Sequence, residues 1–162
     1  MYYPQKYKSL EEALDGRHTW RTQGSKVVFT NGCFDLLHAG HVTYLSQAKA
    51  LGDKLVLGLN SDKSIRTIKG DSRPLVSLDN RVILLDALSM IDMIVSFDEA
   101  TPVALIQALK PDIHVKGGDY QPDALPEYPV VKRYGGEVRI LSFVEGLSTT
   151  RLVDRIRSLP GT

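Results

Sequence analysis

The chain has 162 residues, of which 43% are hydrophobic and 24% are charged, a composition typical of a folded globular domain. Twenty Lys and Arg residues nearly balance nineteen Asp and Glu residues, and the net charge of +1 creates no field that would attract nucleic acid or an anionic membrane. The single cysteine excludes an intrachain disulfide, and no apolar run reaches the roughly 18 residues of a membrane span. We therefore expect one cytoplasmic domain over residues 1–162 that binds neither nucleic acid nor membranes.

The order of the predicted elements indicates an α/β fold. Ser9 and Glu12 have the spacing of a capping box, which predicts a helical extension over residues 1–24. Apolar runs then alternate with amphipathic segments. The predicted strands cover residues 26–30, 54–60, 91–97, 112–116 and 137–142. The predicted helices cover residues 42–51, 61–70, 78–90, 101–110, a stretch that ends near 134, and 148–158.

Strands that alternate with helices predict a doubly wound, Rossmann-like parallel sheet of five strands, because each parallel crossover needs a connecting helix. Ligands of such sheets bind beyond the carboxyl ends of the strands, where the strand order reverses. The functional residues are therefore expected near the ends of the predicted strands, which fall at Thr30, Asn60, Phe97, Lys116 and Ser142.

The segment that follows the first predicted strand carries two of the four histidines. His38 and His41 lie three residues apart where a helix begins, so both imidazoles face one side of it, beside backbone N–H groups that lack helical partners. Gly32 and Gly40 allow close approach of the backbone. This arrangement favours a phosphate site, although surface histidines and a metal site are alternatives.

Two motifs in this order resemble those of the nucleotidyltransferase superfamily, in its cytidylyltransferase-like branch: residues 38–41 (HAGH) and residues 145–150 (EGLSTT). Three further segments are similar to those of the heptose 1-phosphate adenylyltransferases, namely residues 60–62 (NSD), 69–74 (KGDSRP) and 115–120 (VKGGDY). The resemblance implies transfer of AMP from ATP to D-glycero-β-D-manno-heptose 1-phosphate. The products would be pyrophosphate and ADP-heptose, a precursor of the lipopolysaccharide inner core.

The resemblance also implies roles for individual residues. The reacting phosphates are expected to contact His38, His41 and Lys69. The nucleotide is expected to contact Thr30, Asn31, Gly32, Cys33, Phe34, His38, His41, Gly118, Asp119, Ser148, Thr149 and Thr150. The sugar phosphate is expected to contact Asp35, Asn60, Asp62, Arg73, Arg81 and Lys116. Magnesium is expected to arrive with ATP without protein ligands of its own, and a homo-oligomer is the family expectation.

Several alternatives stay open at this point. Phe143 and Val144 stand where the cytidylyltransferase branch has Arg-Thr, which disfavours CTP as the nucleotide. A cytidylyltransferase that acts on a polyol phosphate such as glycerol 3-phosphate is nevertheless one alternative function. A non-catalytic module that binds ATP is another, because a fold alone does not prove an activity.

Overall fold

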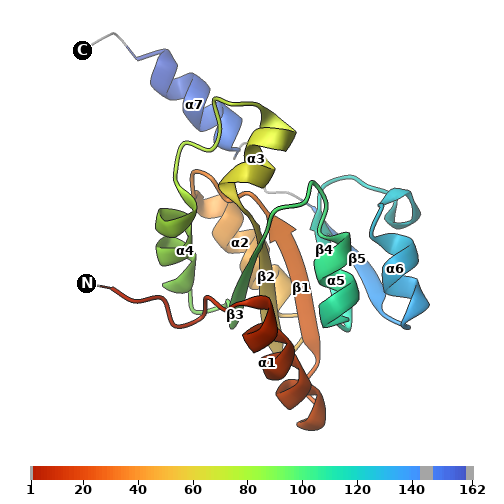
Figure 1. Ribbon diagram of the computed structural model, residues 1–162. Coiled ribbons are helices and arrows are strands. Elements are labelled where there is room, and N and C mark those ends of the chain that lie inside the picture. The colour runs from red at the N-terminus through yellow and green to blue at the C-terminus, as the bar shows by residue number, and fades with distance from the viewer. Residues whose placement is uncertain (1, 143–147, 160–162) are drawn as a thin grey trace.

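The computed structural model describes residues 2–142 and 148–159. A parallel sheet with the strand order β3-β2-β1-β4-β5 forms its centre (Figure 1). The strands are β1 (Val27–Gly32), β2 (Lys54–Asn60), β3 (Met93–Phe97), β4 (Ile113–Gly117) and β5 (Glu137–Leu141). The helices are α1 (Leu10–Thr22), α2 (Ala39–Lys49), α3 (Asp62–Lys69), α4 (Leu78–Asp86), α5 (Val103–Leu109), the 3-10 helix η1 (Pro122–Ala124), α6 (Tyr128–Arg133) and α7 (Thr149–Arg157). The predicted α/β fold with a five-stranded parallel sheet is confirmed.

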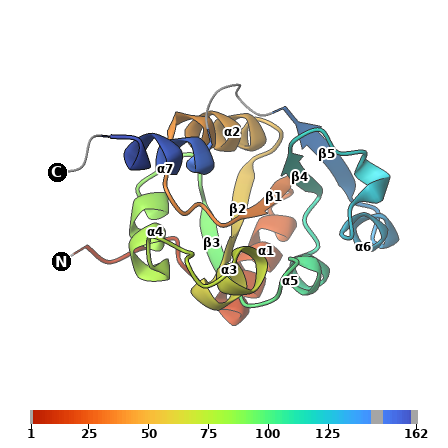
Figure 2. The same ribbon diagram turned by 90° about the horizontal axis from the view of Figure 1, so that it is seen from above.

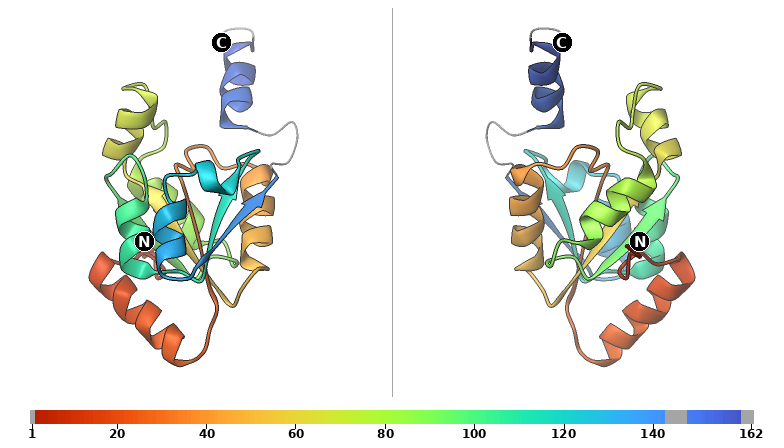
Figure 3. Two further views of the ribbon diagram at one scale, coloured as in Figure 1. Left: turned by 90° about the vertical axis from the view of Figure 1, so that its right-hand side faces the viewer. Right: turned by 90° about the vertical axis from the view of Figure 1, so that its left-hand side faces the viewer.

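Helices cover both faces of the sheet (Figures 2 and 3). On one face, α2 and α4 bury an apolar cluster that includes Leu45, Leu57 and Leu85. On the other face, α1, α5 and α6 bury a second cluster around Phe29 and Ile106. In the described part of the chain, no helix is both long and apolar enough to span a membrane.

The strand order brings the loops after β1 and β4 together. Strand β1 pairs with β2 on one side and with β4 on the other, so the connections leave these neighbouring strands in opposite directions and open a crevice at their carboxyl ends. Helices α3 and α7 lie beyond this end of the sheet (Figure 1). The fold therefore places the loops that the sequence singles out around one edge.

Two helix boundaries differ from the predicted ones by three residues or more. Helix α2 begins at Ala39 rather than at residue 42, since His38 takes the N-cap position. Helix α4 ends at Asp86 rather than at residue 90. The Asp86 carboxylate accepts hydrogen bonds from the Tyr2 hydroxyl and from the Lys6 backbone N–H, which ties the amino-terminal segment to the end of this helix.

The amino-terminal segment packs against the sheet. Tyr7 forms a parallel bridge with Ile94, and backbone hydrogen bonds flank this bridge on both sides, so the segment extends the sheet beyond β3. The predicted capping box of Ser9 and Glu12 starts α1. Arg17 of α1 is buried and donates to the carbonyl oxygen of Leu109, which joins α1 to the end of α5.

Candidate active site

The loop between β1 and α2 has a tightly packed backbone. A side chain at Gly32 would meet the Phe34 ring, because a Cβ atom placed there lies 2.7 Å from Phe34 Cε2. Phe34 itself has a positive φ of 46° and is buried, a conformation that costs energy for a non-glycine residue. The ring centroids of Phe34 and His41 lie 5.0 Å apart. The loop therefore packs the Phe34 ring against the His41 ring.

His38 and His41 meet at the start of α2, as the sequence predicts. Their rings stack with centroids 3.8 Å apart. The Nδ1 atom of His41 accepts from the His38 backbone N–H at 3.4 Å. A neutral imidazole that accepts through Nδ1 carries its proton on Nε2, so His41 is left with an Nε2–H donor for a ligand.

Both histidines are neutral near pH 7. Burial, together with the nearby His38 ring and the Lys69 ammonium, lowers the pKa of His41 to about 4. Burial also lowers the pKa of His38. A bound triphosphate would favour the charged form, but the free protein presents hydrogen-bond donors without a full positive charge at these positions.

Lys69 ends helix α3 and lies beside the same loop. Its ammonium interacts electrostatically with both His41 and Cys33, although its side chain is exposed. Burial raises the pKa of the Cys33 thiol, while Lys69 and Arg81 act in the opposite direction. The structure thus brings His38, His41 and Lys69 together in one cluster, in which Lys69 is the exposed cation.

Asp35 fastens the loop to the segment that follows α3. Its buried carboxylate accepts from Arg73 Nη1 at 2.9 Å and from the backbone N–H groups of Leu75 and Val76 at 2.8 and 2.9 Å. Burial alone would raise the pKa of Asp35, but these donors bring it below its usual value. The protein itself therefore satisfies the Asp35 carboxylate, which joins the histidine loop to residues 73–76. The contact of Arg73 with the sugar phosphate stays a prediction.

Arg81 is fully buried and makes four hydrogen bonds. Its guanidinium donates to the carbonyl oxygens of Cys33, Asn60 and Val76 at 2.7, 2.8 and 3.0 Å and to Asp62 Oδ1 at 2.7 Å. These contacts join the loop after β1 to the end of β2 and to α3. Arg81 is fully buried and its donors are taken by the protein, so a direct contact with the sugar phosphate is not supported for it. Asp62 is partly exposed, and its contact with the sugar phosphate stays a prediction.

Two further predicted ligand contacts point into the protein. Thr30 is fully buried, and its Oγ1 shares hydrogen bonds with the Tyr44 hydroxyl at 2.6 Å and with the Val115 carbonyl at 3.0 Å. Asn60 is also buried and donates to Ser64 Oγ at 2.9 Å. These side chains contact the core rather than an open surface, so the expected contacts with nucleotide and substrate are not supported for them.

The remaining predicted contacts lie on the far side of β1 and at α7. Lys116 Nζ lies 3.5 Å from Asn31 Oδ1, and Gly118 and the exposed Asp119 follow β4.

Thr149 Oγ1 donates to the Leu36 carbonyl at 3.5 Å, which brings the start of α7 to the histidine loop. Ser148 caps α7, and Thr150 is exposed. Residues 143–147, with the first half of the predicted second motif, lie outside the described residues.

Sequence reasoning missed Glu127, which precedes α6 and lies 3.7 Å from Lys116 Nζ through its Oε1 atom. Its side chain is almost completely buried. The segment around it is rich in proline and lacks a periodic pattern, so no signal in the sequence marked this residue.

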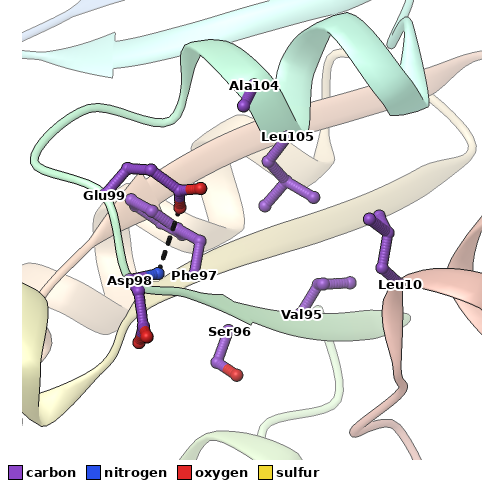
Figure 4. Close-up of a pocket in the computed structure, with 8 residues that line it drawn as sticks. All are labelled: Leu10, Val95, Ser96, Phe97, Asp98, Glu99, Ala104 and Leu105. Atoms are coloured by element: carbon purple, nitrogen blue, oxygen red, sulfur yellow. Dashed lines mark hydrogen bonds between the residues drawn. The ribbon is translucent and has the colours of Figure 1, made fainter.

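A cavity of about 280 Å³ lies away from the histidines, between α1, β3 and α5 (Figure 4). Its walls include Leu10, Val95, Phe97 and Leu105, with Asp98 and Glu99 among its polar lining. None of the predicted site residues lines it. Strand β3 is the outermost of the five strands on this side, two positions from β1, so this cavity is separate from the crevice at the end of β1 and β4.

The described residues form no set of side chains that could bind magnesium by themselves. Within residues 2–142 and 148–159, no group of three or more His, Cys, Asp and Glu side chains is arranged to hold a metal ion. Asp35 and Asp62 are each paired with an arginine. A magnesium ion that enters with ATP would take its ligands from phosphates and water, as is usual for nucleotide-bound magnesium.

The sequence profile of the Cytidylyltransferase-like family matches residues 29–155, which include the histidine loop and the start of α7. The chain belongs to the cytidylyltransferase-like family. This assignment confirms the predicted membership of the nucleotidyltransferase superfamily.

Two relatives of the same name match most of this chain. The chain is 54% identical to Bifunctional protein HldE of Syntrophotalea carbinolica over 154 residues, which are 95% of this chain and 31% of the relative. It is 52% identical to Bifunctional protein HldE of Geobacter metallireducens over 151 residues, 93% of this chain and 31% of that protein. The chain thus spans about a third of the length of the curated relatives it matches.

Two solved structures resemble the fold. The crystal structure of the lipopolysaccharide core biosynthesis protein from Thermoplasma volcanium has a TM-score of 0.60 and 28% identity, and the match covers 75% of this chain and 98% of that chain. The pantoate-beta-alanine ligase from Francisella tularensis has a TM-score of 0.62 with 14% identity, covering 93% of this chain and 76% of that chain. The latter likeness shows the fold alone.

Proposed function

We propose that the chain is an adenylyltransferase that transfers AMP from ATP to D-glycero-β-D-manno-heptose 1-phosphate, giving ADP-heptose and pyrophosphate. The observation that carries this proposal is the stacked pair of neutral histidines at the start of α2, with Lys69 beside it. The family assignment, the relatives named HldE and the lipopolysaccharide core biosynthesis protein of similar fold all support it.

The reaction requires positioned donors rather than a protein nucleophile. An oxygen of the sugar phosphate attacks the α-phosphorus of ATP, the new P–O bond forms as the bond to the β-phosphate oxygen breaks, and pyrophosphate leaves with that electron pair. Negative charge grows on the oxygens around the α-phosphorus, so donors fixed in advance stabilise the transition state. We assign this role to the Nε2–H of His41 and to the His38 ring.

Lys69 supplies the positive charge that the neutral histidines lack. It is exposed at the end of α3, beside His41 and Cys33, where its ammonium can reach the phosphates that become pyrophosphate. The backbone N–H groups at the start of α2 and α7 add further donors for phosphate oxygens. Magnesium that arrives with ATP would neutralise part of the triphosphate charge.

The proposal is tested by incubating the protein with Mg²⁺, heptose 1-phosphate and either ATP or CTP, and following pyrophosphate release and the nucleotide sugar by mass spectrometry. We expect ADP-heptose with ATP and little product with CTP. Product formed with CTP and glycerol 3-phosphate would instead identify a cytidylyltransferase, and ATP binding without any turnover would identify a binding module. The expected homo-oligomer and cytoplasmic location stay predictions.

A further inference from the structure

A second polar cluster lies on the other side of β1 from the histidines. It consists of Asn31, Lys116 and Glu127, and we call it the corner cluster. Asn31 and Lys116 lie at the carboxyl ends of the neighbouring strands β1 and β4. Lys116 Nζ lies 3.5 Å from Asn31 Oδ1 and 3.7 Å from Glu127 Oε1. Three elements therefore converge at the crevice where ligands of such sheets bind.

Glu127 is the unusual member of this cluster. Its side chain is 2% exposed, and its Oε2 atom is buried with no hydrogen-bond partner in the part of the chain that the structure describes. Buried carboxylates are normally hydrogen-bonded, because burial without a partner is costly. The 3.7 Å contact with Lys116 is also longer than a charge-assisted hydrogen bond of about 2.7–2.9 Å. The protein leaves the acceptor capacity of this carboxylate unused.

The alternation of side chains along β1 puts the corner cluster opposite the histidines. Phe29 and Asn31 project to the same face of the strand, and Phe29 packs in the cluster covered by α1, α5 and α6. Helix α2, which carries His41, covers the opposite face. An in-line transfer brings the attacking oxygen to the face of the α-phosphorus away from the leaving pyrophosphate. If pyrophosphate leaves beside the histidines and Lys69, the acceptor enters from the corner cluster.

The chemistry of the three side chains decides which part of an acceptor they fit. The carboxylate accepts from hydroxyl groups, the ammonium donates to them, and the amide of Asn31 can do both. A buried carboxylate repels a phosphate, so the cluster does not suit the phosphate end of a substrate. We propose that Asn31, Lys116 and Glu127 bind the hydroxyl groups of the acceptor sugar and set which sugar phosphate is used. This inference rests on the proposed function and deepens it.

The test is the Glu127→Gln variant, assayed with heptose 1-phosphate and ATP. The amide keeps the size of the side chain but removes the negative charge and one strong acceptor. We expect the KM for the sugar phosphate to rise at least about tenfold, as for a lost charged hydrogen bond, while the KM for ATP changes less than about twofold. Glu137→Gln is the matched control, because Glu137 is a more exposed glutamate paired with Arg139 on β5.

Sugar phosphates that lack single hydroxyl groups sharpen the test. The wild-type protein should discriminate against the analogue that lacks the hydroxyl bound by Glu127, and Glu127→Gln should not. An unchanged KM for the sugar phosphate, or an equal rise in the KM for ATP, would overturn the inference. If Glu127→Gln does not fold, as seen by circular dichroism, Lys116→Gln provides the same KM comparison. Wild-type protein that turns over no sugar phosphate would instead refute the proposed function, and the corner cluster with it.

Discussion

The two sides of β1 differ in how firmly their polar side chains are held. On the side of α2, the histidine loop is fixed by Asp35 and Arg81, whose hydrogen bonds measure 2.7–3.0 Å. On the side of α6, Lys116 makes only longer contacts of 3.5 and 3.7 Å with Asn31 and Glu127. On the first side, the protein itself satisfies the groups that hold the loop and leaves the His41 Nε2–H donor in a fixed place. On the second side, Glu127 Oε2 has no hydrogen-bond partner among the described residues.

This difference agrees with what each side is proposed to bind. Donors that stabilise a transition state work best when the protein fixes them before the reaction, because no reorganisation is then needed. A subsite for sugar hydroxyls gains affinity when the ligand satisfies groups that the protein leaves unpaired. The fixed side therefore suits the reacting phosphates, and the looser side suits the acceptor.

The largest effect is expected from Arg81→Lys on the fixed side. A lysine ammonium cannot reach the carbonyls of Cys33, Asn60 and Val76 and the Asp62 carboxylate together. The loss of two charged hydrogen bonds predicts a free energy of unfolding lower by about 3 kcal/mol, measured by chemical denaturation. Arg133→Lys on the exposed face of α6 is the control. A change of less than about 0.5 kcal/mol for Arg81→Lys would contradict the supporting role.

The next largest effect is on the pH dependence of stability and comes from His114, which is buried on β4 beside Phe29. Burial lowers its pKa to about 3, so it stays neutral in the folded protein while the unfolded chain binds a proton below about pH 6.5. Its stabilising contribution is complete above that pH and is lost as the pH falls from 6.5 toward 3. Between pH 7 and 5, wild-type protein should lose about 2 kcal/mol more unfolding free energy than His114→Phe. Parallel pH curves for the two proteins would refute this.

A smaller but more specific effect is predicted for His41→Ala. Removal of one donor to the reacting phosphates should lower kcat at least about tenfold, with the unfolding temperature close to that of wild type. His18→Ala is the matched control, because His18 is exposed on α1 and lies outside the site. An unchanged kcat in folded His41→Ala protein would remove His41 from the reaction.

The pH profile of the free enzyme should show no step near pH 6.5. The pKa of His41 is about 4, so His41 loses no proton between about pH 5.5 and 7.5, and burial also lowers the pKa of His38. We therefore expect kcat/KM for ATP to be flat over this range, since that quantity reports the pKa values of the free enzyme. Activity that falls as the pH rises through 6.5 would show that a protonated histidine is required.

The sequence predicts the fold well because its signals are periodic and local. Apolar runs mark all five strands, and the capping residues Ser9, Ser61 and Ser148 start their helices where expected. The end of α4 at Asp86 is not predicted, and there the Asp86 carboxylate accepts from Tyr2 and Lys6 of a segment about 80 residues away in sequence. Contacts between residues this far apart in sequence leave no mark in a local pattern.

The site is predicted in part. The histidine pair was found because its spacing and its place after a strand are both visible in the sequence. Arg81 was assigned to the substrate, although it lies four residues before the buried Leu85 and so on the same face of α4. Thr30 was likewise assigned to a ligand, although it lies two residues after the buried Val28 and so faces the core on the same side of β1. Glu127 was missed because only the tertiary structure brings it to Lys116.

A crystal structure of the protein with a non-hydrolysable ATP analogue tests directly whether the histidine pair binds the reacting phosphates. We predict an α-phosphate oxygen within about 3.2 Å of His41 Nε2, with the β- and γ-phosphates toward Lys69 and no nucleotide atom in contact with Glu127. A triphosphate bound away from His38 and His41 would contradict the account.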